Sequence, residues 1–270
     1  MGAQGMELVV LGSAGWVPQP ARMTTCLALR AAELLVVFDA GTGLARLKEP
    51  EFRRLVPEAG PVHVFLSHLH LDHTVGLSFL PALWQANETV LHVPVGPAAG
   101  EADATALIDR LVGPPFFPHT LGQQPHPVGV VGLEPGEVSV WGPGADLTVR
   151  MRAQRHAGGS LGFRVDDKLA FLTDTVYEEE SAGFARGVSL LVHEAWSLGR
   201  DDPPELAAGL SSHTSALNAA RVARDAGVGE LLLSHLSPLA DESYYAEMLA
   251  AARTIFPATS LCEDGLARVL

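Results

Sequence analysis

Residues 62–73 read Val62-His63-Val64-Phe65-Leu66-Ser67-His68-Leu69-His70-Leu71-Asp72-His73, so an apolar segment is followed directly by four potential metal ligands. The apolar run predicts a buried strand that ends near Ser67. Side chains alternate along an extended chain, so we expect His68, His70 and Asp72 to point the same way, with His73 joining them after a turn. Imidazole nitrogens and carboxylate oxygens suit zinc and similar divalent ions. This stretch therefore predicts a metal site at a strand end.

Three later apolar segments are each followed, at their carboxyl end, by a residue that could bind metal. His156 follows the strand predicted at 147–153, Asp174 follows the one at 168–172, and His235 follows the one at 230–234. Together with the first cluster they make seven candidate ligands. Two ions need a set of this size when each keeps a position open for water or substrate, and a shared carboxylate such as Asp174 could bridge them.

Strands and helices are mixed along the chain, which favours the α/β class with sheets covered by helices. A segment rich in proline and glycine, 94–143, separates two strand-rich halves. Further strands are predicted at 8–11, 26–30, 34–38, 128–131, 138–141, 162–165 and 190–192, and helices at 74–84, 102–111, 215–226 and 241–255. Ser and Thr capping candidates introduce the helix at 215–226 and Gly227 closes it.

The composition indicates an enzyme with one substantial core. The chain has 270 residues, of which 47% are hydrophobic, and we expect residues 1–270 to form a single domain made of two similar halves. Cys26 and Cys262 lack the spacing of a disulfide framework or a cysteine-based zinc module, although a single bridge stays open. Neither a secretory signal nor a run long enough to span a bilayer is present, so we expect a cytoplasmic location without membrane association.

A formal charge of −13 disfavours an extended nucleic acid as partner, because phosphate backbones are held mainly by clustered lysine and arginine. We expect a small anionic substrate instead. Arg150, Arg152, Arg155 and Arg164 form the one arginine-rich stretch. They could contact that substrate, or they could occupy solvated positions on two exposed strands.

The order and spacing of these motifs resemble those of the metallo-β-lactamase superfamily over nearly the whole chain. The matching elements are Asp39-Ala40-Gly41, His68-x-His70-x-Asp72-His73, His156, Asp174 and His235. The resemblance implies an αββα four-layer sandwich of two mixed sheets flanked by helices, with a dinuclear metal site at one edge of the sheets. It implies one ion held by His68, His70 and His156 and another held by Asp72, His73 and His235, with Asp174 shared.

Other segments look most like the branch that holds ribonuclease Z and related cyclic-nucleotide phosphodiesterases. They are residues 156–164, Leu191-Val192-His193-Glu194-Ala195, and Ser212-His213-Thr214-Ser215-Ala216. A β-lactamase of this superfamily would usually carry Cys where Asp174 stands. Bacterial ribonuclease Z carries a long arm for transfer RNA where this chain has room only for a strand hairpin, between His156 and Asp174, and Pro238-Leu239 replaces an Arg-Tyr pair. These departures favour a smaller phosphodiester.

The expected function is a dinuclear-metal-dependent hydrolase, a phosphodiesterase that acts on a small phosphodiester or nucleotide through a metal-bridging hydroxide. Zinc is the expected metal, with manganese and iron as alternatives. His213 is the candidate general acid, Glu194 could orient it, and Asp72 could accept a proton from the attacking water as well as bind metal. Asp39 could brace the ligand loop.

Three alternatives stay open. The first is a metal-dependent hydrolase of carbon esters, thioesters or lactones, and the second is a transfer-RNA 3′ endonuclease of the ribonuclease Z type that lacks the usual arm. The third is a non-catalytic metal-binding protein. A homodimer is also left open by the sequence. We expect residues 12–15 to form a tight turn near the site, and His63 and His92 to be packing residues.

Overall fold

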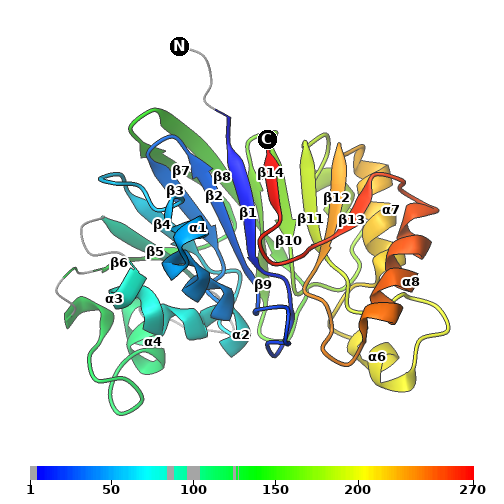
Figure 1. Cartoon of the computed structure of the whole chain (residues 1–270), viewed down its shortest axis with the longest axis horizontal. Helices are drawn as coiled ribbons and strands as arrows, with labels where there is room; N and C mark the ends of the chain where they lie inside the picture. Colours follow the sequence, from blue (N-terminus) through cyan, green and yellow to red (C-terminus); the bar gives the residue numbers. More distant parts are fainter. Residues whose placement is uncertain (1–4, 84–87, 96–103, 124–125, 127) are drawn as a thin grey trace.

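Two mixed sheets of seven strands each are packed face to face, with helices on both outer surfaces (Figure 1). The computed structural model describes residues 5–83, 88–95, 104–123, 126 and 128–270. The four layers run helix, sheet, sheet, helix, as the resemblance to the metallo-β-lactamase superfamily implied, and the αββα fold class is therefore confirmed. In the described ranges, no helix is long and apolar enough to cross a bilayer.

The first sheet comes from the amino-terminal half and the last strand of the chain. Strands β1 to β3 are antiparallel, whereas β3 to β6 run parallel. In spatial order the strands are β14 (Ala267–Val269), β1 (Glu7–Gly12), β2 (Cys26–Ala31), β3 (Leu34–Phe38), β4 (Val62–Phe65), β5 (Thr89–Pro94) and β6 (Val128–Leu133). Every residue of β3 is buried, because one face meets the other sheet and the opposite face meets helices.

The second sheet has a parallel half, β10 to β13, and an antiparallel half, β7 to β10. In spatial order the strands are β13 (Thr259–Leu261), β12 (Glu230–Ser234), β11 (Leu190–Glu194), β10 (Leu169–Leu172), β9 (Ser160–Val165), β8 (Ala145–Gln154) and β7 (Gly136–Gly142). Strands β9 and β10 form the hairpin that was predicted between His156 and Asp174.

Apolar side chains fill the space between the sheets and the two spaces beneath the helices. Between the sheets, the Phe38 ring lies 5.3 Å from Phe163 and 5.9 Å from Phe65, measured between centroids. The first sheet is covered by η1 (Thr42–Lys48), α1 (Pro50–Arg53) and α4 (Ala104–Leu111), and the second by α5 (Glu180–Phe184), α7 (Ala216–Ala226) and α8 (Glu242–Arg253). The short helix α6 (Pro204–Gly209) follows β11. Cys26 and Cys262 are buried free thiols.

Local sequence signals set the ends of the helix predicted at 215–226. Ser215 accepts a hydrogen bond from the Asn218 amide at 3.3 Å, and Gly227 closes α7 with a positive φ of 65°. The helix predicted at 241–255 is α8, and the Asp241 side chain caps it.

The single helix predicted at 74–84 is wrong. The chain instead forms α2 (Leu71–Thr74), a 3₁₀ turn η2 (Val75–Phe79) and α3 (Leu80–Leu83), while Trp84 lies outside the described residues. The amide of Gly76 donates to the Ala40 carbonyl at 2.7 Å, and a Cβ at this position would overlap backbone oxygens of the loop after β3. This tertiary contact interrupts the helix. Because α2 starts early, Asp72 lies on a helical turn and not on an extended chain.

The carboxyl ends of the parallel strands of both sheets meet at one edge of the molecule. Asp39 follows β3, Asp174 follows β10, and His235 follows β12, and all three take positive φ values of 60°, 51° and 50°. Such a backbone conformation is uncommon outside glycine and costs about 1–3 kcal/mol where the surroundings impose it. The sharp turn after each strand directs these side chains toward the shared edge.

Candidate metal centre

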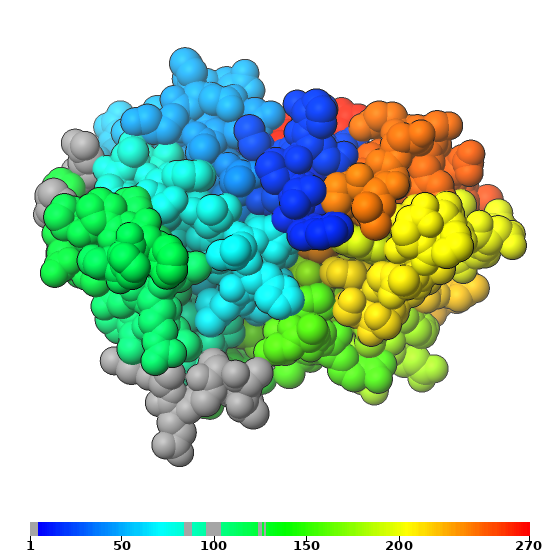
Figure 2. Space-filling view, turned by 90° about the horizontal axis from the view of Figure 1, so that it is seen from below, coloured from blue at the N-terminus to red at the C-terminus, as the bar shows by residue number. Residues whose placement is uncertain are grey.

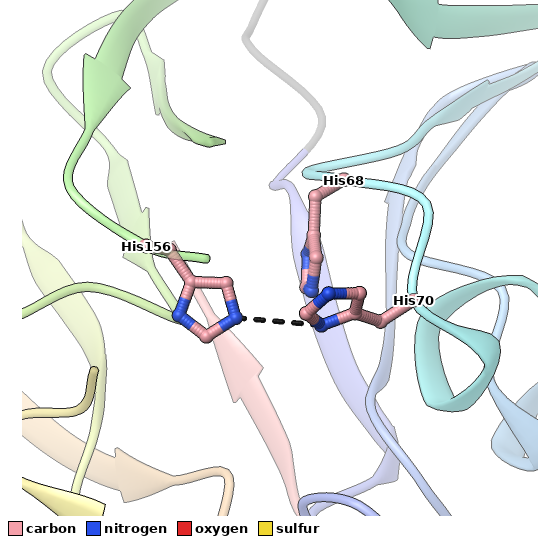
Figure 3. Close-up of side chains that lie close together, drawn as sticks. All are labelled: His68, His70 and His156. Carbon is pink, nitrogen blue, oxygen red and sulfur yellow. Dashed lines mark hydrogen bonds between the residues drawn. The ribbon is translucent and has the colours of Figure 1, made fainter. Parts of the chain in front are cut away.

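Three histidines from two distant segments form the first half of the site (Figure 3). His68 and His70 lie on the extended segment between β4 and α2, and His156 lies on the loop after β8. Nδ1 of His70 is 3.4 Å from Nε2 of His156, and one ring nitrogen of each of the three residues lies within 4.8 Å of the others. We call these three residues the first triad.

Asp72, His73 and His235 form the second half of the site, which we call the second triad. Nε2 of His73 lies 3.3 Å from Nε2 of His235, and Oδ2 of Asp72 lies 3.3 Å and 3.5 Å from these two nitrogens. Two nitrogens and one oxygen therefore face a common point.

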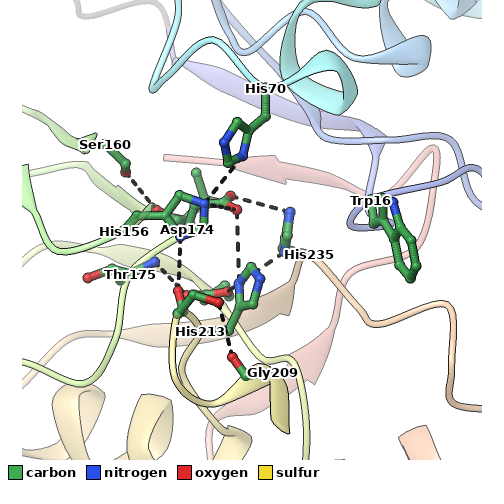
Figure 4. A network of polar contacts seen from close by, with 12 residues as sticks. Trp16, His70, His156, Ser160, Asp174, Thr175, Gly209, His213 and His235 are labelled. Carbon is green, nitrogen blue, oxygen red and sulfur yellow. Dashed lines mark hydrogen bonds and ion pairs between the residues drawn. The ribbon is translucent and has the colours of Figure 1, made fainter. Parts of the chain in front are cut away.

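Asp174 lies between the two triads and presents one carboxylate oxygen to each (Figure 4). Oδ1 is 3.5 Å from Nε2 of His156, whereas Oδ2 is 3.2 Å from Nε2 of His73 and 3.3 Å from Nε2 of His235. The seven residues singled out in the sequence are thus brought together, in the two groups that the resemblance implied.

Neighbouring groups fix which ring nitrogen of His73 and of His156 faces the centre. Nδ1 of His73 lies 2.8 Å from the Asp39 carboxylate, which also accepts hydrogen bonds from the amide and hydroxyl of Ser67 at 2.7 Å and 2.9 Å. Nδ1 of His156 donates to the Ser212 carbonyl at 3.0 Å. Because the outer nitrogens are used in this way, the Nε2 atoms remain for the centre. Asp39 braces the ligand loop, as predicted.

The donor set fits divalent metal ions. Nε2 of His68 is buried and has no hydrogen-bond partner within the described residues, and an orphaned buried nitrogen calls for a ligand. Burial and the adjacent imidazoles lower the pKa of His68, so its ring is neutral, the form that binds metal. Burial raises the pKa of Asp174, but the surrounding histidines outweigh this effect and hold the pKa well below its usual range. The buried His/Asp clusters are consistent with a binuclear site.

A hydrogen-bonded group lies beside the centre on the carboxyl-end side of β11. Nδ1 of His213 is 2.7 Å from Oε2 of Glu194 and 3.9 Å from Oδ1 of Asp174. The His213 ring stacks on the Trp196 ring at 4.4 Å with an interplanar angle of 10°. We call His213, Glu194 and Trp196 the polar wall.

Glu194 connects the polar wall to the candidate ligand Asp174 through the backbone. Its Oε1 atom accepts hydrogen bonds from the amides of Thr175, at 2.7 Å, and Thr214, at 3.1 Å. Thr175 follows Asp174 and Thr214 follows His213, so one buried carboxylate holds both functional side chains in position. Burial lowers the pKa of His213, but the charge and hydrogen bond of Glu194 raise it by more, and the net shift is upward.

The turn at residues 12–15 does lie next to the site. A Cβ on Gly15 would come within 2.6 Å of the His235 ring, so only glycine fits there. The amide of the exposed Trp16 donates to Oδ2 of Asp72 at 2.8 Å. Viewed from below, this dark-blue turn, the cyan 70–80 segment and the yellow and yellow-green parts of the second half meet on one face (Figure 2).

The side chains of the arginine-rich stretch form ion pairs and hydrogen bonds within this chain. Arg150 pairs with Glu137 at 3.2 Å, and Arg152 and Arg155 both pair with Glu178. Arg164 donates to backbone carbonyls. Of the two interpretations of this stretch, the contacts favour the structural one.

The other histidines stay apart from the centre. His63 and His92 contact each other at 3.0 Å, and His92 stacks on Phe65 at 4.0 Å, so both are packing residues as predicted. Nδ1 of His193 contacts the Glu194 carbonyl at 3.0 Å.

Comparison with known proteins places the chain in a family. A family model described as "Beta-lactamase superfamily domain" matches residues 35–236, well over half of the chain. The chain is 27% identical to "Ribonuclease Z" of Synechococcus sp. (strain WH7803), with 97% of this chain and 95% of that protein covered. The alignment runs over 322 positions, more than this chain has residues, so the relative holds segments without counterpart here.

Two solved structures share the fold. The metallo-β-lactamase fold protein YhfI from Bacillus subtilis has a TM-score of 0.75 at 20% identity, with 99% of this chain and 100% of that chain covered. A diphosphatase from the PhnP family has a TM-score of 0.65 at 16% identity and covers 97% of both chains. With the family model matched over residues 35–236, these findings identify the chain as a member of the metallo-β-lactamase superfamily.

Proposed function

We propose that this chain is a phosphodiesterase that hydrolyses a small phosphodiester with the help of two divalent metal ions, zinc foremost, with manganese and iron as alternatives. The proposal rests on the position of Asp174. Its two carboxylate oxygens face the two triads, and its Oδ1 atom lies 3.9 Å from Nδ1 of His213. The site combines a shared carboxylate, six further candidate ligands and an acid, His213, next to them. This combination is suited to cleaving a phosphorus–oxygen bond.

In this proposal His68, His70 and His156 hold one ion, Asp72, His73 and His235 hold the other, and Asp174 contributes to both. When bound, the ions supply Lewis acidity, which lowers the pKa of water and offsets the charge that develops on the phosphoryl oxygens. The chain supplies ligands whose outer nitrogens are already held by Asp39 and the Ser212 carbonyl, so little reorganisation is needed.

His213 is the proposed general acid for the leaving oxygen. Glu194 occupies its Nδ1 atom, so the Nε2 atom is the one available to donate a proton. The upward pKa shift keeps the ring protonated at higher pH than an ordinary histidine. Glu194 acts as a positioning residue, since it contacts His213 and the chain next to Asp174.

Asp72 is assigned a ligand role in preference to that of proton acceptor. Burial raises its pKa, but hydrogen bonds from His235 and His73 outweigh burial and hold the pKa far below its usual range. A carboxylate with so low a pKa is a weak base.

Two features favour a small substrate over transfer RNA. The β9–β10 hairpin is short, and the arginines of the 150–164 stretch are paired with acidic side chains or backbone carbonyls. The net charge of −13 adds long-range repulsion of a polyanion.

The direct test is hydrolysis of bis(p-nitrophenyl) phosphate by metal-loaded protein. We expect turnover that stops with a chelator and returns when zinc or manganese is restored. The same preparation would be tested against a carbon ester, a thioester, a lactone and a precursor transfer RNA. No turnover of the phosphodiester, together with turnover of one of the carbonyl substrates, would contradict the proposal. A protein that holds metal but turns over none of them would support a non-catalytic role.

A further inference from the structure

A cavity of about 500 Å³ opens next to the first triad, between the edges of the two sheets. His68 and His70 form one side of it, and Pro94, Leu133, Ala153 and Leu161 are among the apolar residues that form the rest. A volume of this size lies in the range of small-molecule sites. The cavity is therefore continuous with the metal centre and large enough for part of a substrate.

The cavity is the open end of the core between the sheets. Along β8, Leu147, Val149 and Met151 face the core, and the two-residue alternation of a strand puts Ala153 on the same face. Ala153 pairs with Leu161 of β9, which belongs to the same core. Because the side chain at position 153 is only a methyl group, the space that larger residues fill deeper in the core stays open here.

The lining carries no charge of its own. Among the described residues that border the cavity there is no Lys, Arg, Asp or Glu, and the ionisable groups are the two histidines of the first triad. Arg152 and Arg155, the nearest arginines in sequence, are paired with Glu178 at 3.0 Å and 3.3 Å. A second phosphate or a carboxylate would find no cation in this cavity, and burying an unpaired charge there would be costly.

The polar atoms of the lining are mostly engaged with each other. Nε2 of Gln154 donates to Oγ of Ser160 at 2.9 Å and to the Thr173 carbonyl at 2.8 Å. The Ser160 hydroxyl donates to the same carbonyl at 3.2 Å. Oε1 of Gln154 has no partner in the described residues, but it is buried against Gly162. Recognition in this cavity therefore depends on apolar contact more than on hydrogen bonds.

The cavity and the general acid lie on different sides of the centre. In Figure 4, His70 and His213 are separated by Asp174 and His156, and no residue of the polar wall borders the cavity. A diester bound at the centre therefore has two distinct places for its two substituents. The leaving group belongs near His213, and the group that stays on phosphorus belongs in the cavity.

We propose that this cavity binds an uncharged aryl group on the retained side of the phosphodiester. The proposal rests on the proposed function for the reaction at phosphorus and adds the chemical class of the substrate. The occupant is apolar and about the size of one or two fused rings, because the lining residues that the structure describes offer no cation to the further phosphates of a nucleotide chain.

The kinetic test compares two substrates with the same leaving group, phenyl p-nitrophenyl phosphate and methyl p-nitrophenyl phosphate. After division by the uncatalysed rate constants, we expect kcat/KM for the phenyl ester to be about 30-fold higher, since burying a ring removes apolar surface from water. Ala153→Phe fills the cavity and should bring this ratio close to one, because the phenyl group loses its place there. Ala267→Phe makes the same change at an exposed strand position in β14 and should leave the ratio unchanged.

A binding measurement separates the cavity from catalysis. Calorimetry with metal-loaded protein would compare diphenyl phosphate with dimethyl phosphate, and we expect the diphenyl ester to bind about 30-fold more tightly, a preference that Ala153→Phe removes. If no phosphodiester is turned over but this preference holds, the proposed function fails and the aryl site stands. If the methyl ester is turned over but neither ratio exceeds one, the aryl site is contradicted and the proposed function stands. Thermal unfolding of the variants checks that they fold.

Discussion

The two walls of the candidate metal centre differ in chemistry although they flank the same centre. The polar wall is a hydrogen-bonded group in which Glu194 contacts His213, Thr175 and Thr214. The opposite wall is an apolar cavity whose described lining residues include no acidic or basic side chain apart from the two candidate ligands His68 and His70. Proton transfer requires an oriented, charged group, whereas binding an apolar substituent requires space without charge. Under the proposed function, this difference sets the direction in which a diester would lie across the centre.

Removing Asp174 should have the largest effect, because both triads lose a shared oxygen. We expect Asp174→Ala to lower turnover of bis(p-nitrophenyl) phosphate by at least about 1,000-fold, whichever wall the substrate uses. Asp167→Ala removes an exposed carboxylate from the turn of the same hairpin and serves as the matched control. Nearly full activity of Asp174→Ala would mean that the centre does not depend on the residue that joins its halves.

Removing His213, the proposed general acid of the polar wall, should have an effect that depends on the leaving group. We expect His213→Gln to lower kcat by about 100-fold with methyl phenyl phosphate but by only about 10-fold with methyl p-nitrophenyl phosphate, since p-nitrophenolate leaves readily without a proton. The preference for phenyl over methyl at the retained position should be unchanged. Equal losses with both leaving groups would show that His213 is merely structural.

Ala153→Phe changes the apolar cavity, whereas His213→Gln changes the polar wall. Ala153→Phe should remove the roughly 30-fold aryl preference and leave the leaving-group dependence intact. If Ala153→Phe and His213→Gln both changed the aryl preference, or both changed the leaving-group dependence, the two walls would not act separately.

The smallest effect is expected on the pH dependence of stability, when a histidine that belongs to neither wall, His92, is replaced. Burial, and to a lesser extent the neighbouring His63, lowers the pKa of His92 from 6.5 to about 3. The folded protein keeps this ring neutral while the unfolded chain takes up a proton below its ordinary pKa. Proton uptake by His92 in the unfolded chain therefore lowers the free energy of unfolding as the pH falls from 6.5 toward 3.

Between about pH 7 and about pH 5 this contribution amounts to about 2 kcal/mol of unfolding free energy. His92→Phe keeps the stack on Phe65 and should remove that part of the pH dependence, as measured by urea unfolding at both pH values. The exposed His119→Phe is the control. Parallel pH profiles for the wild type and His92→Phe would show that the His92 ring takes up a proton as readily in the folded protein as in the unfolded chain, and would contradict this account.

The candidate ligands could be located because they lie in the segments that follow predicted strands, and the αββα fold class followed from the resemblance to the superfamily. Asp174 and His235 are examples: strand periodicity locates both, and the resemblance groups them. The contacts of Trp16 and Ser212 were missed because a backbone amide and a backbone carbonyl make them, and such groups leave no signal in residue type.

Other features depended on tertiary contacts that no local pattern records. The helix predicted at 74–84 is broken because Gly76 packs on the loop after β3, which is distant in sequence. Arg152 and Arg155 share Glu178, which lies beyond the intervening hairpin, so the sequence left their role undecided. The stack of Trp196 on His213 joins two segments that sequence spacing does not relate.

The most direct test of the central claim is the number of metal ions bound per chain. Protein loaded with zinc and then freed of excess metal would be measured by elemental analysis together with its protein concentration. The account predicts two ions per chain for the wild type, one for each triad. A value near zero after loading, or an unchanged value when both His68 and His73 are replaced by Ala, would contradict it.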